Sequence, residues 1–232
     1  MVILMKEYKM IILDADDTLY DFSKAEKYAF ENAMRDLDLD YNESYLPIYK
    51  KINIGIWKDL EKGLITQKEL KPERFRRFLD EVGLEGDGNT FSDAFLDHLS
   101  RATFLFDGAM ELVKELSKKY RLVLITNGLT RVQKYRVRQH EIAQYFEKVI
   151  ISEEIGYAKP NPMIFVEGLK DLEEVSKDRV IIIGDSLTSD IQGGINYGID
   201  TCWFNFKNKA NNSNIKPTFI VSTFDELQDI IL

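Results

Sequence analysis

The sequence predicts an α/β fold: a parallel sheet with helices on both faces and a helical domain inserted after the first strand. Short apolar runs such as Met10–Leu13 are typical of strands that are buried on both sides. After residue 106 such runs alternate with helical patterns, which calls for a parallel sheet. Residues 22–105 carry helical patterns without a convincing strand, and we interpret them as the insertion.

The inserted tract predicts four amphipathic helices. Ser23 with Glu26, and Thr66 with Glu69, have the spacing of a capping box at the start of the first and third helices. Apolar residues recur at helical spacing in all four: Phe22, Ala25, Ala29, Ala33 and Leu37; Tyr45, Ile48, Tyr49, Ile52, Ile56 and Leu60; Phe75, Phe78, Leu79 and Val82; Phe91, Phe95 and Leu99. We expect a small bundle. It would form a cap domain of residues 21–105, inserted in a core of residues 1–20 and 106–232.

The rest of the chain alternates helix and strand. Asn161 is expected to cap a helix whose first residue is Pro162. The polar stretch Lys207–Lys216 is interpreted as a surface loop. The expected strands are Leu122–Ile125, Val149–Ile151, Val180–Ile183, Thr201–Phe204 and Phe219–Val221; the expected helices are Ala109–Tyr120, Thr130–Glu141, Asn161–Asp171, Ser189–Tyr197 and one that begins at Thr223.

Composition limits the kinds of molecule that the protein is expected to bind. The chain has 232 residues, enough for one or two domains with a substantial core. The net charge of −8 argues against general affinity for nucleic acid or for an anionic membrane surface. An anionic small substrate is still compatible with this charge, because a local cation can invert the field inside one cleft.

Cysteine content and hydropathy indicate a cytoplasmic protein. Cys202 is the single cysteine, so an intramolecular disulfide and a cysteine zinc site are excluded, and we interpret it as a core residue. Val2–Met5 is too short for the apolar part of a signal peptide. No uncharged apolar stretch approaches the ~18 residues of a membrane span. The sequence leaves open whether the protein is a monomer or a dimer.

Polar residues follow the ends of four expected strands. Because the carboxyl ends of parallel strands meet at one edge of the sheet, we expect these residues to converge there. They are Asp14 and Asp16 after the first strand, then Thr126, Asn127 and Gly128, then Gly156, Lys159 and Pro160, and last Gly184, Asp185, Ser186 and Asp190.

Carboxylates gathered in one cleft need a cation. Two unit charges ~4 Å apart repel by about 4 kcal/mol at an effective dielectric constant near 20. The available ligand atoms are all oxygens, which favours Mg²⁺ over zinc or copper. We expect Asp14, Asp185 and the backbone carbonyl of Asp16 to be the metal ligands. Asp190 would orient Lys159 or a metal-bound water; the alternative is a solvated residue in the first turn of a helix.

The neighbouring residues suit a phosphoryl group. Gly128 would let the backbone after Thr126 turn its amides toward an anion, with Asn127 between them, and Lys159 adds a positive charge. A carboxylate among such groups predicts phosphoryl transfer with a covalent intermediate. In this mechanism Asp14 attacks phosphorus to form an aspartyl-phosphate. Asp16 protonates the leaving alkoxide and then acts as base on the hydrolytic water.

Four motifs resemble those of the haloacid dehalogenase-like hydrolase superfamily, in the same order along nearly the whole chain. They are DADDT at Asp14–Thr18, TNG at Thr126–Gly128, KP at Lys159–Pro160 and GDSLTSD at Gly184–Asp190. The resemblance implies a Rossmann-like core, a Mg²⁺ cofactor and the roles given above. A helical insertion between the first two motifs is similar to the type 1 cap. The namesake dehalogenases lack the second acidic residue, so Asp16 favours a phosphatase.

Finer stretches resemble the pyrimidine 5′-nucleotidase branch, the nucleotide house-cleaning enzymes. They include SEEIG at Ser152–Gly156, the segment Ser189–Asn205, and Asn53 and Trp57 in the cap. The resemblance implies a phosphatase of nucleoside 5′-monophosphates. Asn53 would hydrogen-bond a base edge or face solvent, and Trp57 would stack on a base or belong to the core.

Three other functions stay open: a phosphatase of another small metabolite such as phosphoglycolate or a sugar phosphate, a β-phosphoglucomutase-like phosphomutase, and a non-catalytic phosphate-binding protein. We interpret Arg74 and its neighbours Arg76 and Arg77 as a solvated helix face.

Overall fold

The computed structural model describes residues 7–232 and divides into two compact units. The sheet unit contains the chain up to Asp21, Leu105–Thr130 and Val137–Leu232, and the helical unit contains Phe22–Phe104 and Arg131–Arg136. The sequence assigned residues 131–136 to the core domain. They group with the helical unit, where Arg131 pairs with Asp93 at 2.5 Å and with Asp97 at 2.6 Å. Val2–Met5 lies outside the described residues.

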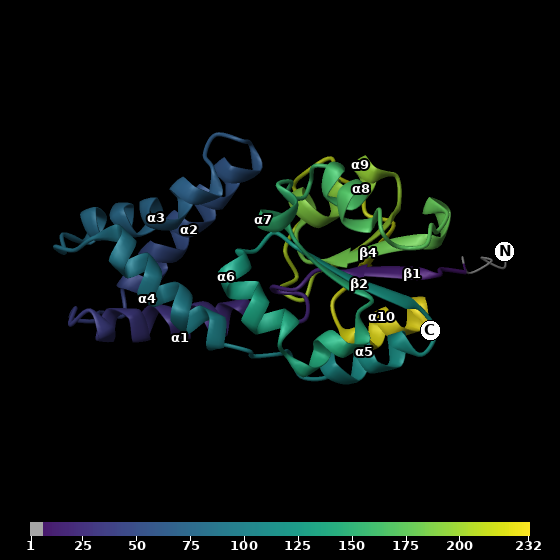
Figure 1. The fold of residues 1–232 in the computed structure, drawn as a ribbon, viewed down its shortest axis with the longest axis horizontal. Helices are drawn as coiled ribbons and strands as arrows, with labels where there is room; N and C mark the ends of the chain where they lie inside the picture. The colour runs from purple at the N-terminus through teal and green to yellow at the C-terminus, as the bar shows by residue number, and fades with distance from the viewer. Residues whose placement is uncertain (1–6) are drawn as a thin grey trace. The chain divides into compact units, whose positions relative to one another are not determined.

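The sheet has six strands in the order β3-β2-β1-β4-β5-β6, and every neighbouring pair is parallel. Strand β1 lies between β2 and β4 (Figure 1), and all four of its residues are buried. Its apolar composition suits this position, since a strand between two layers of helices meets no solvent. The bounds are β1 Met10–Leu13, β2 Arg121–Thr126, β3 Lys148–Ile151, β4 Val180–Gly184, β5 Asp200–Phe204 and β6 Phe219–Val221.

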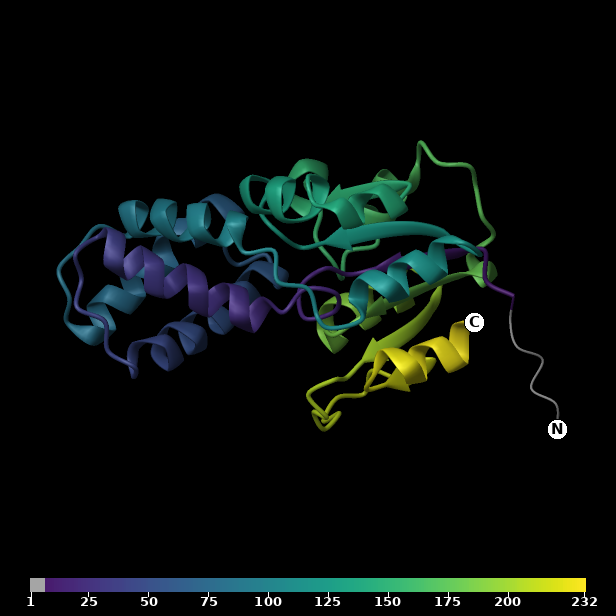
Figure 2. The ribbon, with the colours of Figure 1, turned by 90° about the horizontal axis from the view of Figure 1, so that it is seen from below.

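Helices cover both faces of this sheet, so the predicted α/β fold is confirmed. Alternate β1 residues enter two separate apolar cores, as the two-residue period of a strand requires. Ile11 and Leu13 share one core with helices α5 (Ala109–Ser117) and α10 (Phe224–Ile231). Ile12 shares the other with α8 (Met163–Leu169). Figure 2 shows α5 and α10 on the same side of the sheet.

Four helices form the helical unit, and all lie where the sequence predicts them: α1 Phe22–Asp36, α2 Tyr45–Glu61, α3 Gln67–Val82 and α4 Gly88–Arg101. Aromatic rings fill their interior, and the centroids of Phe75 and Phe91 are 4.6 Å apart. The capping box of Thr66 and Glu69 is confirmed. The box predicted at Ser23 is wrong, because α1 already begins at Phe22. Glu26 is buried instead and accepts a hydrogen bond from Asn53.

Two helices predicted after the insertion contain π-helical segments. The helix expected at Thr130–Glu141 consists of α6 (Thr130–Gln133) and a π-helical segment at Lys134–Arg138. The helix expected at Ser189–Tyr197 consists of a π-helical segment at Leu187–Ile191 and then α9 (Gln192–Tyr197). Such insertions are frequent at functional sites. The sequence missed the short helix α7 (Ser152–Ile155) and two 3₁₀ turns, at Glu141–Tyr145 and Lys177–Arg179.

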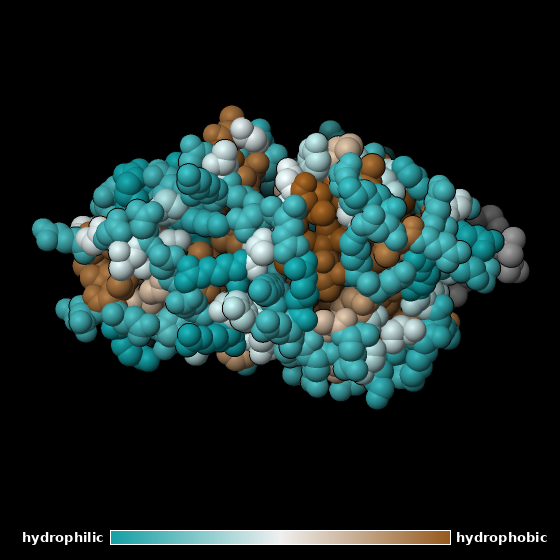
Figure 3. Space-filling model, viewed as in Figure 1, coloured by the Kyte–Doolittle hydropathy of each residue, from teal (hydrophilic) through white to brown (hydrophobic). Residues whose placement is uncertain are grey.

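Two further local predictions concern Asn161 and Cys202. The Asn161 side chain accepts a hydrogen bond from the Met163 N–H at 3.0 Å, but α8 begins at Met163 with Pro162 as its N-cap, so the predicted helix start is wrong by one residue. Cys202 is fully buried in the core. Among the residues that the structure describes, no helix is long and apolar enough to cross a bilayer. The face seen in Figure 3 is mostly hydrophilic, in keeping with the high charge content of the chain.

Gly194 allows α9 to pack directly on the sheet. A Cβ atom at this position would lie 2.5 Å from Ile182 Cγ2 and 2.6 Å from Thr201 Cγ2. We expect Gly194→Ala to lower the Tm in a thermal denaturation experiment. Overpacking costs ~1–3 kcal/mol, whereas the higher helix propensity of alanine returns at most about 1 kcal/mol.

Gly55 provides the matched control, because it lies inside α2 with nothing within 4 Å of its ideal Cβ. Gly55→Ala should stabilise the protein by about 0.5–1 kcal/mol through helix propensity alone. A Tm of Gly194→Ala at or above that of the wild type would contradict the close packing.

Candidate active site

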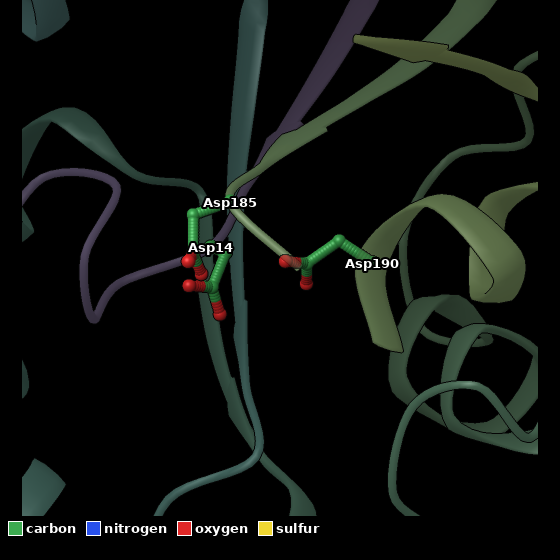
Figure 4. Close-up of side chains that lie close together, drawn as sticks. All are labelled: Asp14, Asp185 and Asp190. Atoms are coloured by element: carbon green, nitrogen blue, oxygen red, sulfur yellow. The ribbon is translucent and has the colours of Figure 1, made fainter. Parts of the chain in front are cut away.

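Three carboxylates meet at the carboxyl edge of the sheet. One oxygen each of Asp14, Asp185 and Asp190 lies within 4.8 Å of the others, and Figure 4 shows the three side chains turned toward one another. Asp14 follows β1 and Asp185 follows β4. These strands are neighbours with Leu13 opposite Ile183, so Asp14 leaves the sheet opposite Gly184, one residue before Asp185. The strand register therefore brings Asp14 and Asp185 together, and Asp190 joins them from the π-helical segment after β4.

Lys159 is buried among these carboxylates, with 1% of its surface exposed. Its Nζ lies 2.6 Å from Asp14 Oδ1, 2.7 Å from Asp190 Oδ1 and 2.6 Å from the carbonyl oxygen of Ile125. A buried charge is tolerated only when it is paired in this way. Burial alone would lower the pKa of the Lys159 ammonium, but Asp14 and Asp190 outweigh it and raise the pKa above its ordinary value.

Asp190 is 1% exposed, so the alternative of a solvated residue is wrong. Besides its ion pair with Lys159, its Oδ2 accepts a hydrogen bond from the Ser186 N–H at 3.0 Å. Both oxygens therefore already have partners in the protein. This arrangement suits a residue that orients Lys159 better than one that binds a metal directly.

The surroundings of Asp14 and Asp185 disfavour the charged form of each carboxyl group. Burial raises the pKa of Asp14 well above its ordinary value, against the opposing effect of Lys159. Burial, together with Asp190 and Asp17, raises the pKa of Asp185 to about 7. A divalent cation between the two would restore the charged forms.

The donor set fits the predicted Mg²⁺. Asp14 and Asp185 offer carboxylate oxygens, the hard ligands that this ion takes. The Asp16 carboxylate is not a member of the cluster. The contributions of its backbone carbonyl to the metal and of its side chain to proton transfer stay predictions. The Trp203 indole donates to the backbone oxygen of Asp185 at 2.8 Å and so fixes the chain at that ligand.

Among the predicted phosphate-binding residues, Asn127 and Lys159 are in direct contact. Thr126 is the last residue of β2, which pairs with β1. The Asn127 side chain binds the backbone of Lys159 at both its N–H and its carbonyl oxygen, each at 2.8 Å, and also contacts Ser189. The Gly128 carbonyl accepts a hydrogen bond from Ser152. Asn127 thus positions Lys159, and phosphate binding by these residues stays a prediction.

Several residues that hold the site together were given no individual role by the sequence analysis. Gly184 is one, since a Cβ atom there would lie 2.3 Å from Asp190 Cγ. Only glycine lets the Asp190 side chain pack against the end of β4. Ser186 and Ser189 are others, through their contacts with Asp190 and Asn127. The sequence does carry a signal for them, because all three residues belong to one polar segment at the end of a buried strand.

The polar loop after β5 also contributes to the site. Lys207 Nζ lies 2.7 Å from Asp17 Oδ2, and Lys209 Nζ lies 3.4 Å from Asp185 Oδ2. The sequence interpretation of Lys207–Lys216 as only a surface loop was therefore incomplete. The loop follows a strand of the same parallel sheet, and this position could have revealed the contact.

The two residues predicted to recognise the substrate base lie in α2 of the helical unit. Trp57 is half-buried. Asn53 is buried: its Nδ2 donates to Glu26 Oε1 at 2.8 Å and its Oδ1 accepts from Arg74 Nη1 at 3.1 Å. The alternative in which Asn53 faces solvent is thus wrong. The role of either residue in substrate choice stays a prediction.

Arg74 is buried as well, so its interpretation as part of a solvated helix face is wrong. Its guanidinium lies over the rings of Phe75 and Phe95, at 4.8 and 5.0 Å from their centroids. Arg76 and Arg77 are exposed as predicted. Helical spacing cannot distinguish an arginine that stacks between aromatic rings from one in water.

We expect Asn53→Ala to destabilise the protein. The substitution leaves Glu26 and Arg74 buried without their shared partner, which costs about 1–3 kcal/mol. Thermal denaturation should show a lower Tm, whereas Lys51→Ala, at an exposed position of the same helix, should stay within about 0.5 kcal/mol of wild type. An unchanged Tm for Asn53→Ala would contradict the structural role of this bridge.

Comparison with known proteins agrees with this geometry. The family model of the haloacid dehalogenase-like hydrolases matches residues 8–198, which include every residue of the acidic cluster. The chain belongs to the haloacid dehalogenase-like hydrolase family. The resemblance inferred from the four motifs is thereby confirmed, as is the prediction that the protein is an enzyme.

Relatives of this hydrolase cover nearly its whole length. The pyrimidine 5′-nucleotidase PynA of Streptococcus pneumoniae is 34% identical, over 97% of this chain and 95% of the relative. The pyrimidine 5′-nucleotidase YjjG of Escherichia coli is 31% identical, over 97% and 98%. The crystal structure of the hydrolase YfnB of Bacillus subtilis, bound to magnesium, superimposes with a TM-score of 0.92 at 34% identity, over 97% of this chain and 99% of that one.

Proposed function

We propose that this hydrolase is a magnesium-dependent phosphatase that releases phosphate from nucleoside 5′-monophosphates, with pyrimidine nucleotides preferred. The observation that carries the proposal is the position of Asp14. Its carboxylate lies at the centre of the sheet edge, 2.6 Å from the Lys159 ammonium and close to the carboxylates of Asp185 and Asp190. The substrate class is supported by the two nucleotidase relatives.

The reaction proceeds through the chain's own residues in two steps. An oxygen of Asp14 attacks phosphorus in line, the bond from phosphorus to the ester oxygen breaks, and Asp16 donates its proton to the leaving alkoxide. Asp16 then takes a proton from the water that attacks the aspartyl-phosphate, which releases phosphate and regenerates Asp14.

Charge compensation comes from the groups around Asp14. Lys159 and the backbone amides after Thr126 would stabilise the negative charge of the phosphoryl oxygens. Asp14, Asp185 and the Asp16 carbonyl would hold Mg²⁺, which supplies further positive charge at the phosphoryl group when bound. Asn127 and Asp190 keep the lysine in position through their contacts with it.

A phosphate-release screen of the purified protein with Mg²⁺ tests the proposal. UMP, dUMP and TMP are expected to be hydrolysed faster than phosphoglycolate and sugar phosphates. The reverse order would overturn the substrate class but leave the chemistry intact, and isomerised sugar phosphate without free phosphate would instead identify a phosphomutase. Protein carrying Asp14→Asn, purified in parallel, is the control for contaminating phosphatases. A cytoplasmic location and a monomeric or dimeric state stay predictions.

A further inference from the structure

The chain makes a tight turn directly after β5, at Asn205–Lys209, which we call the lysine turn. The Asn205 side chain closes it by accepting from the Lys209 N–H at 2.8 Å and donating to the Lys209 carbonyl at 2.9 Å. Asn208 adopts a left-handed conformation with a φ of 49°. The Asn205 N–H donates to Val221 in β6 at 2.7 Å, which ties the turn to the sheet. This segment is therefore held in one shape.

The lysine turn delivers two ammonium groups to the acidic site. Lys207 contacts Asp17, the residue after Asp16, at 2.7 Å, and Lys209 contacts Asp185 at 3.4 Å. The two carboxylates are 18% and 17% exposed, so solvent screens these pairs less than it screens pairs on an open surface. Asp17 itself has a φ of 59°, a conformation that is uncommon outside glycine.

The four carboxylates of Asp14, Asp17, Asp185 and Asp190 are thus matched by three ammonium groups. This leaves one formal negative charge among them, whereas Lys159 alone would leave three. A more negative site binds a divalent cation more tightly. It also repels a phosphate dianion more strongly, because the two ligands respond to the same field with opposite sign.

We propose that the lysine turn sets the balance between cation and phosphate binding at this site: Lys207 and Lys209 weaken the binding of Mg²⁺ and strengthen the binding of the phosphoryl group. The proposal rests on the proposed function for the identity of the two ligands. The lysine turn would thus take part in binding, although its composition alone indicates only exposure to solvent.

The double variant Lys207→Gln/Lys209→Gln tests this balance. Calorimetry with Mg²⁺ alone should give a Kd about 3–10-fold lower than wild type. Inorganic phosphate, titrated at saturating Mg²⁺, should bind about 3–10-fold more weakly. Both changes should shrink as ionic strength rises. The matched control is Lys114→Gln/Lys216→Gln, which removes the same charge from exposed positions of the sheet unit and should leave both affinities unchanged.

The affinities for Mg²⁺ and for phosphate are expected to change in opposite directions, which separates this role from a structural one. Loss of both affinities, or no change in either, would overturn the proposal. Lys207→Arg/Lys209→Arg retains the charges and should restore both affinities toward wild type; failure to do so would also count against it. Neither titration requires turnover, so a protein that hydrolyses no nucleotide would refute the proposed function and leave this inference to be decided by the binding data.

Discussion

Asp14→Asn is expected to abolish phosphate release, with kcat lowered by about 10⁴–10⁶-fold, the scale seen when the nucleophile of a covalent mechanism is removed. The amide cannot form the aspartyl-phosphate, although it has nearly the same shape as the carboxylate. It also removes one of the two anionic partners of Lys159. Steady-state phosphate release from UMP with Mg²⁺ measures the effect.

Asp229→Asn is the matched control for this substitution, since Asp229 is exposed on α10 of the same unit. It should retain the wild-type rate. Circular dichroism of both variants should match wild type, which separates loss of chemistry from loss of fold. Turnover by Asp14→Asn close to that of wild type would refute covalent catalysis by Asp14.

Asp16→Asn is expected to lower kcat by about 10²–10⁴-fold, the contribution of one general acid–base group. The variant retains Asp14, so phosphorylation remains possible but slow. Inorganic phosphate should still bind, because Asp16 is assigned to proton transfer and contributes only its backbone carbonyl to the metal.

One measurement distinguishes this effect from that of Asp14→Asn. Intact-protein mass spectrometry after mixing with substrate should detect a phosphorylated species in Asp16→Asn and none in Asp14→Asn. An unchanged kcat for Asp16→Asn would remove this residue from its assigned role.

Most of the fold could be predicted because its signals are local. Met10–Leu13 is wholly apolar and ends abruptly on Asp14, which defines both a buried strand and its exit. The four helices of the insertion follow from the helical recurrence of residues such as Phe75, Phe78 and Leu79. Helix starts were less certain, as Ser23 illustrates, because capping depends on which residue first departs from the helical conformation.

Contacts between distant segments could not be predicted in the same way. The hydrogen bonds from Asn127 to Lys159 join two loops whose separation is set by the strand order of the sheet. The residues next to Arg74 and Lys209 in the sequence do not indicate their contacts. Tertiary packing places Arg74 over two aromatic rings and Lys209 beside the Asp185 carboxylate. The π-helical segment that carries Asp190 was equally hidden, because over five residues its apolar pattern does not differ from that of an α-helix.

The central position of β1 has a consequence for biosynthesis. This strand is translated well before its neighbours β2 and β4, which begin only at Arg121 and Val180. Pairings of such large sequence separation form late and slowly during folding. Asp14 is therefore translated long before the segments that will surround it. A nascent chain that stops short of Asp190 already contains Asp14 but cannot complete the acidic cluster.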